Sequence, residues 1–184
     1  MKTLKLSLCF LIILSFTACT AGEFRNIISF IDTYNELSDI KLSLSDFIVS
    51  DKDYTALIEN NMSLNLKEDK DGRIYMCRLA INKSENAADY CGTYTEVLLN
   101  VIRTYCSYDT SKALEIIKAF SFDNKETLMS TGELTLNSEN FSFVYYSNEV
   151  TSEFRITNTY LKKTETTEKP VSKPYYGENF IEKD

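Results

Sequence analysis

The stretch MSLNLKEDKDGRIYMCRLAI, residues 62–81, decides the fold class of this 184-residue chain. Apolar and polar residues alternate on both sides of a charged turn, which is the pattern of a half-buried β-hairpin. The dipeptide Asp71-Gly72 supplies the positive φ that hairpin turns require. We therefore expect an antiparallel hairpin, with one face formed by Tyr75, Cys77, Leu79 and Ile81.

Before this hairpin, apolar residues recur at three- and four-residue intervals, which predicts an amphipathic helix over residues 24–38. These residues are Ile27, Ile28, Ile31, Tyr34 and Leu37. The next segment, IKLSLSDFIV at residues 40–49, alternates as a strand does. A helix and a strand are thus expected on the N-terminal side of the hairpin.

After the hairpin, Thr93 and Glu96 form a capping-box pattern ahead of VLLNVIRTYC, and Asp109 or Thr110 can cap SKALEIIKAF. We expect two consecutive helices, or one helix broken near Tyr108. Three alternating segments then end the domain as strands: GELTL, NFSFVYY and SEFRITN.

This order predicts the α+β class: an antiparallel β-sheet with helices packed on one face. Duplication of a unit made of a helix and a β-meander would give the same order of helices and strands. The residues of the two halves are rarely identical, so duplication stays open. The helices that contain Leu98, Ile102 and Ile116 should cover the core face of the sheet. We expect that face to carry Tyr75, Leu79, Ile81, Phe141, Phe143 and Phe154.

The N-terminus has the features of a secretory signal. Lys2 and Lys5 precede an apolar run from Leu6 to Phe16, which is shorter than the roughly 20 residues of a transmembrane helix. The triplet Cys19-Thr20-Ala21 can serve as a small-x-small cleavage site, and cleavage before Gly22 would release a secreted soluble protein.

The residues Thr17-Ala18-Cys19 offer another cleavage, because they resemble the lipobox of bacterial lipoprotein precursors. The match has one departure: Phe16 stands where that family usually has an aliphatic residue. The resemblance implies that residues 1–18 are a lipoprotein-type signal peptide and that acylated Cys19 anchors the protein on the outer side of the cell membrane or in the envelope. We favour this interpretation over soluble secretion.

The remaining chain divides into a single α+β domain, residues 19–161, and a polar, flexible C-terminal tail, residues 162–184, which holds both prolines. Without the leader, 18 basic residues oppose 27 acidic ones, a net charge of −9. Such a surface would repel nucleic-acid phosphates and anionic lipid. We therefore expect no nucleic-acid partner, and contact with the membrane through the N-terminal lipid alone.

The chain has no histidine, which excludes Ser-His and Cys-His nucleophiles and the usual zinc ligand. The turn KEDKDG mimics part of a calcium loop, but Lys67 occupies the first ligand position and Arg78 stands where the bidentate Glu is needed. No metal or cofactor is expected. We interpret Cys77, Cys91 and Cys106 as buried thiols, or as one disulfide between Cys77 and either of the others.

These observations favour an exported, lipid-anchored, non-catalytic surface domain that binds a protein or another envelope ligand. One alternative is an enzyme, a small carboxylate-dependent hydrolase. Another alternative is a structural component of the envelope. The absence of Trp argues against a sugar-cleaving hydrolase, since such enzymes usually stack sugars on Trp.

If helices cover the Phe143 face, the opposite face carries Met76, Arg78, Val144, Tyr146, Arg155 and Thr157. Tyr and Arg supply many binding hot spots. We therefore predict that Tyr146 and Arg155 anchor a ligand there, the alternative being that the tail or another strand covers this face.

Overall fold

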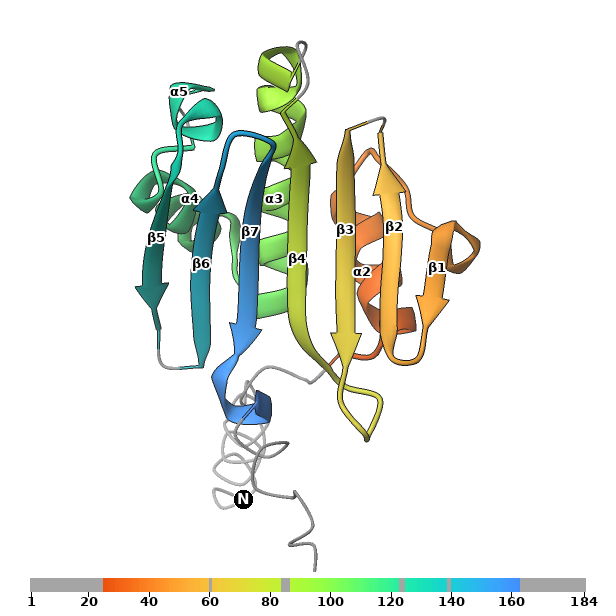
Figure 1. Cartoon of the computed structure of the whole chain (residues 1–184). Coiled ribbons are helices and arrows are strands. Elements are labelled where there is room, and N and C mark those ends of the chain that lie inside the picture. The colour runs from red at the N-terminus through yellow and green to blue at the C-terminus, as the bar shows by residue number, and fades with distance from the viewer. Residues whose placement is uncertain (1–24, 60, 84–86, 123–124, 139, 163–184) are drawn as a thin grey trace, which may run out of the picture.

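The sheet of the protein has seven antiparallel strands in the order β1-β2-β3-β4-β7-β6-β5 (Figure 1). The computed structural model describes residues 25–59, 61–83, 87–122, 125–138 and 140–162. Cys19, the leader and the tail from residue 163 lie outside the described residues. The strands are β1 (Phe47–Ser50), β2 (Asp53–Ile58), β3 (Met62–Glu68), β4 (Ile74–Asn82), β5 (Gly132–Asn137), β6 (Phe141–Ser147) and β7 (Thr151–Asn158).

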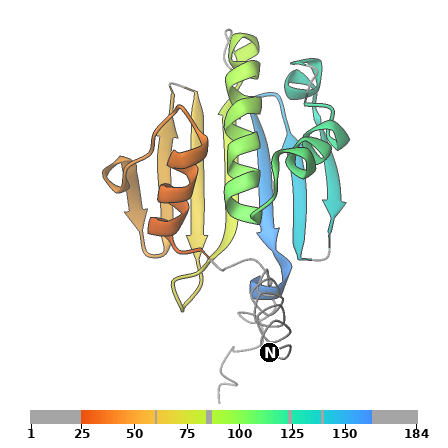
Figure 2. The ribbon, with the colours of Figure 1, turned by 180° about the vertical axis from the view of Figure 1, so that it is seen from behind.

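Helices cover one face of this sheet, as Figure 2 shows from behind. In chain order, the helical elements are α2 (Ile27–Leu37), η1 (Leu44–Asp46), η2 (Ala87–Tyr90), α3 (Cys91–Cys106), α4 (Thr110–Ala119) and α5 (Lys125–Met129). Helix α3 lies in the middle of the layer and contacts both α2 and α4. The expected α+β class, with helices on one face of an antiparallel sheet, is confirmed.

Side-chain caps set two of the helix boundaries. The Asn26 side chain accepts a hydrogen bond from Ser29 N at 2.9 Å, so α2 begins at Ile27. Asp109 Oδ1 accepts from Lys112 N at 2.8 Å and starts α4, as the sequence predicts. Ser107 has a left-handed φ of 55°, which ends α3 and separates two consecutive helices.

Two local predictions are wrong. Helix α3 begins at Cys91, directly after η2, so Thr93 lies inside its first turn and cannot act as the N-cap of a capping box with Glu96. Residues 40–46 form no strand, because the Leu42 backbone N–H and C=O bind the Asn35 side chain, both at 2.8 Å. Ser43 and Asp46 then form a capping box around η1.

The core lies between the sheet and the helices, and eight of the nine predicted residues are buried in it. Phe143, Leu98 and Ile102 have no exposed surface. The exception is Tyr75, which is half-buried and outside the core cluster. Lys67 pairs with Met76 but Glu68 pairs with Ile74, so a β-bulge leaves Tyr75 unopposed and turns Ile74 into the core.

The strand order relates the two halves of the sheet. From the central β4–β7 ladder outward, β4, β3 and β2 correspond to β7, β6 and β5, and β1 is an extra edge strand. The topology therefore has the form of a repeated meander, and it matches β3 with β6.

Candidate partner-binding face

The face of the sheet that turns away from the helices is called here the open face (Figure 1). Strand register fixes its members, because residues paired across neighbouring strands point to the same side. All six residues predicted for this face lie on it: Met76, Arg78, Val144, Tyr146, Arg155 and Thr157. Their neighbours along each strand, such as Phe143 and Phe154, point into the core.

One row of paired residues crosses the middle of the open face. Asn65 in β3 pairs with Arg78 in β4, Arg78 pairs with Arg155 in β7, and Arg155 pairs with Val144 in β6. Two arginines thus stand directly opposite each other at the centre of the sheet. Like charges in this arrangement repel, so the pair needs a neighbouring carboxylate.

Glu153 supplies that carboxylate. Its Oε1 accepts hydrogen bonds from Arg155 Nη2 at 2.6 Å and Arg155 Nε at 3.2 Å, which is a forked contact. Arg78 Nη1 lies farther away, 3.5 Å from Glu153 Oε2. The Glu153 side chain is 17% exposed, whereas those of Arg78 and Arg155 are 40% and 45% exposed. One carboxylate therefore serves two guanidinium groups, and it holds Arg155 more closely.

Arg78 also lies beside a buried amide. Asn65 is buried, and its Nδ2 donates to Thr55 Oγ1 at 2.8 Å and to the Asp53 carboxylate. Asn65 Oδ1 and Arg78 Nε are both buried without a hydrogen-bond partner among the described residues. An acceptor and a donor on directly paired residues are thus both unsatisfied, and a bridging water or a small side-chain movement would join them.

The other charged group of this face is an ion pair between β2 and β3. Lys67 Nζ lies 3.0 Å from Asp53 Oδ2. Burial would raise the pKa of Asp53, but hydrogen bonds from Asn65 and Lys67 outweigh it and hold the pKa below the ordinary value of 3.8. Asp53 is therefore a charged structural partner at neutral pH.

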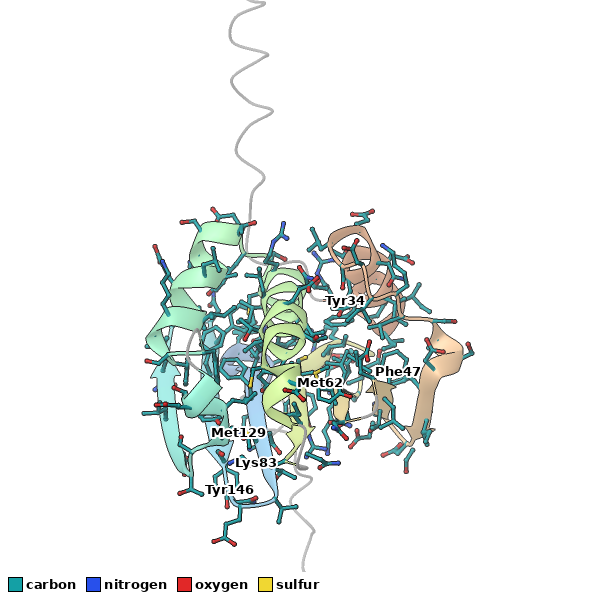
Figure 3. All side chains as sticks on the ribbon, turned by 90° about the horizontal axis from the view of Figure 1, so that it is seen from above. Tyr34, Phe47, Met62, Lys83, Met129 and Tyr146 are labelled. Carbon is teal, nitrogen blue, oxygen red and sulfur yellow. The ribbon has the colours of Figure 1, made fainter. Side chains whose placement is uncertain are left out.

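Exposed apolar and aromatic side chains surround these charges. Tyr146, which is 47% exposed, pairs across the ladder with Glu153. In Figure 3, Tyr146 lies on the far side of the sheet from Tyr34, a buried residue of α2. Ile48 and Leu57, toward the β1 edge, are each 74% exposed. Together with half-buried Met76 and Val144, they give the open face a mixed apolar and polar character.

The charge of the open face differs from that of the whole chain. Its described acidic residues are Asp53, Glu133 and Glu153, and its basic residues are Lys67, Arg78 and Arg155. The face is therefore neutral, whereas the whole chain carries a formal net charge of −7. The excess of acidic residues lies elsewhere on the molecule.

The turn between β3 and β4 is held by its own side chains. Gly72 has a φ of 73°, as the Asp71-Gly72 motif predicts. Asp69 Oδ1 accepts from the backbone N–H groups of Asp71 and Arg73, each at 2.9 Å, and Asp69 Oδ2 accepts from Arg73 Nε at 2.8 Å. Within the described residues, no group of His, Cys, Asp or Glu side chains could hold a metal ion.

The described cysteines form no disulfide. Cys77 and Cys106 are buried on facing elements, β4 and α3, and Cys91 is partly exposed at the start of α3. Burial raises the pKa of the Cys77 and Cys106 thiols well above the ordinary value of 9.0. Neutral thiols in these positions pack as small apolar side chains.

Glu153 and Asn65 are not among the residues predicted for this site. Glu153 has a local signal, because it stands two residues before Arg155 and alternation places both on one face. Asn65 has none, since its contact with Arg78 depends on the β3–β4 register.

The chain was compared with protein-family models, curated proteins and solved structures. None of them matches it. Among the described helices, none is both long and apolar enough to cross a membrane. The geometry of the open face is therefore the basis for a functional proposal.

Proposed function

We propose that this protein is an exported, lipid-anchored, non-catalytic domain that binds a protein partner of the cell envelope through its open sheet face. The observation that carries the proposal is the group formed by Tyr146, Arg155 and Val144, which are neighbours across the β6–β7 ladder. Tyr146 and Arg155 are both exposed, and Tyr and Arg are among the residue types enriched at binding hot spots.

The composition of the face supports a protein partner. It combines exposed apolar side chains with a tyrosine and two arginines, and aromatic residues and Arg are enriched at protein–protein interfaces. Arg155 is already held by Glu153, so part of the entropy of ordering its side chain is lost before a partner binds.

The lipid anchor in this proposal rests on the resemblance of Thr17-Ala18-Cys19 to the lipobox. A diacylated cysteine gives firm membrane attachment, since two chains bury enough CH₂ groups at about 0.8 kcal/mol each. The domain would then work close to the outer surface of the membrane.

The hydrolase alternative has less support. A general acid near neutral pH needs a carboxyl group whose pKa is raised. The two described carboxyl groups with a resolved shift, Asp53 and Asp69, are both shifted downward, because hydrogen bonds to their charged forms outweigh burial. Both therefore favour structural ion pairs over proton transfer.

The test is capture of partners from cell envelope by the wild-type protein and by the double variant Tyr146→Ala/Arg155→Ala. The control variant Leu114→Ala/Lys118→Ala changes two exposed residues of α4, on the opposite side of the molecule. We expect the first variant to lose a partner that the control retains, with both variants folded by circular dichroism. An identical set of partners for all three proteins would refute the proposal.

A further inference from the structure

We infer that the Arg78–Arg155 pair receives a carboxylate of the partner, so that the open face recognises an acidic segment of a protein. This inference rests on the proposed function and names the chemistry of the same surface. Its basis is the unequal sharing of Glu153 between the two arginines.

The guanidinium group of Arg78 has donors to spare. An arginine carries five N–H donors, and Arg78 directs only Nη1 at Glu153, across 3.5 Å. Arg155, in contrast, has two hydrogen bonds to one oxygen of Glu153. The Arg78 side chain is 40% exposed, so its remaining terminal donors can be reached from solvent.

The local charge points to an anion. Asp53 and Lys67 neutralise each other at 3.0 Å, whereas one glutamate faces two arginines at the centre of the open face. The centre therefore has an excess of one positive charge on a chain whose formal net charge is −7. An acidic segment would be repelled by most of this protein and attracted at that centre, which fixes where it docks.

The geometry favours a carboxylate over a bare point charge. The two guanidinium groups stand on directly paired residues of an antiparallel ladder, so the terminal N–H donors that Glu153 leaves unused can bind one carboxylate together. Apolar Val144 and aromatic Tyr146 lie beside them and can cover the stem of a Glu or Asp side chain. Covering this ion pair from water would strengthen it.

The probe for this inference is hexaglutamate, titrated into the ¹⁵N-labelled full-length protein, with hexaglutamine as the uncharged control. We expect hexaglutamate to shift the Nε–H signals of Arg78 and Arg155. The Nε–H signal of Arg73 should stay in place, because that guanidinium already binds Asp69 and Asp71. Unmoved Arg78 and Arg155 signals, or equal shifts with hexaglutamine, would overturn the inference.

Substitutions sharpen the test. Arg78→Gln should weaken hexaglutamate binding about tenfold, the loss expected for one charge-assisted hydrogen-bonded contact. Arg78→Lys keeps the charge without the forked donors and should weaken binding about threefold. Lys118→Gln changes an exposed residue of α4, on the helix side of the molecule, and should leave the affinity within about twofold of wild type. Equal losses for Arg78→Gln and Lys118→Gln would mean attraction by overall charge only, which refutes the site.

This result is separable from that of the partner capture. If Tyr146→Ala/Arg155→Ala loses a partner but hexaglutamate leaves the Arg78 and Arg155 signals unmoved, the face binds through other chemistry and only this inference fails. If the capture shows no difference among the variants, the proposed function fails as well.

Discussion

Arg78 and Arg155 face each other directly in the ladder between β4 and β7, and Glu153 contacts both. This relationship joins residues from the two halves of the chain at the centre of the sheet. It also gives Glu153 a structural role, because the negative charge of Glu153 offsets the repulsion between two positive charges that the strand register brings together.

The variant Glu153→Gln should therefore be less stable than wild type, by about 1 kcal/mol or less for side chains this exposed. Repulsion between the two arginines is screened by salt, so the difference should shrink as ionic strength rises. Urea unfolding at low and high NaCl measures it. If the Glu153→Gln protein is as stable as wild type at low salt, Glu153 is not needed to offset the repulsion between the two arginines.

The core prediction concerns Phe143, which is fully buried between the sheet and the helices. Phe143→Ala should lower the free energy of unfolding by about 3–5 kcal/mol, because it removes a large apolar side chain and leaves a cavity. Val144→Ala, one residue further on the open face, should cost much less. Thermal or urea melts compare them, and similar losses for the two variants would contradict the assignment of faces.

Asp69 gives a pH-dependent prediction. Burial would raise the pKa of Asp69, but hydrogen bonds from the Arg73 side chain and from the backbone of Arg73 and Asp71 hold it below the ordinary value of 3.8. Because the folded pKa is lower than the unfolded one, the stability from Asp69 is present above about pH 4 and is lost as pH falls through the folded pKa.

The variant Asp69→Asn should therefore lose stability at pH 7 and should depend less on pH below about pH 4 than wild type does. Free energies of unfolding between pH 2 and pH 7 measure both effects. Parallel curves for the two proteins would show that Asp69 has the same pKa in the folded and unfolded states.

The thiols give a prediction on reactivity. Cys77 and Cys106 are buried and their pKa values are raised, so both should resist alkylation in the native protein. Cys91 is partly exposed and should react first. Iodoacetamide labelling followed by peptide mass spectrometry ranks them. A Cys77–Cys106 disulfide in non-reduced peptides would contradict the assignment of buried thiols.

The anchor is tested at the N-terminus of the mature protein. If the lipobox resemblance is correct, the first peptide begins at Cys19 and carries acyl chains, and mass spectrometry of that peptide detects them. Cys19→Ser should abolish the modification and release the protein from the membrane. An unmodified peptide that begins at Gly22 would support soluble secretion instead.

Much of the sheet is readable from local patterns. In the segment that contains Phe141, Phe143 and Tyr145, the side chains alternate between the two faces. Burial of these three side chains therefore places Tyr146 on the opposite face. Strand β2 was not predicted, because apolar Leu57 and Ile58 are adjacent and hide the period of two. Leu57 is in fact exposed on the open face. The error at Tyr75 has a different cause: a bulge changes which residues face the core, and alternation cannot show it.

The candidate site was predictable as a face but not as a cluster. Alternation assigns Arg78 and Arg155 to the outside of their own strands. Their contact depends on β4 and β7 being neighbours in one particular register, and no local pattern states which distant strands pair. The same holds for Asn65, whose neutral amide gives no sign of burial between Thr55 and Arg78.

The position of β7 between β4 and β6 affects how the protein can be made. The ladder that joins the two halves uses the last strand of the domain, so a nascent chain that ends before Thr151 has neither the β4–β7 nor the β6–β7 pairing. The two incomplete sheets would expose the inner edges of β4 and β6, which are surfaces prone to aggregation. Both central ladders of the sheet can therefore form only after the C-terminal strand β7 has been synthesised.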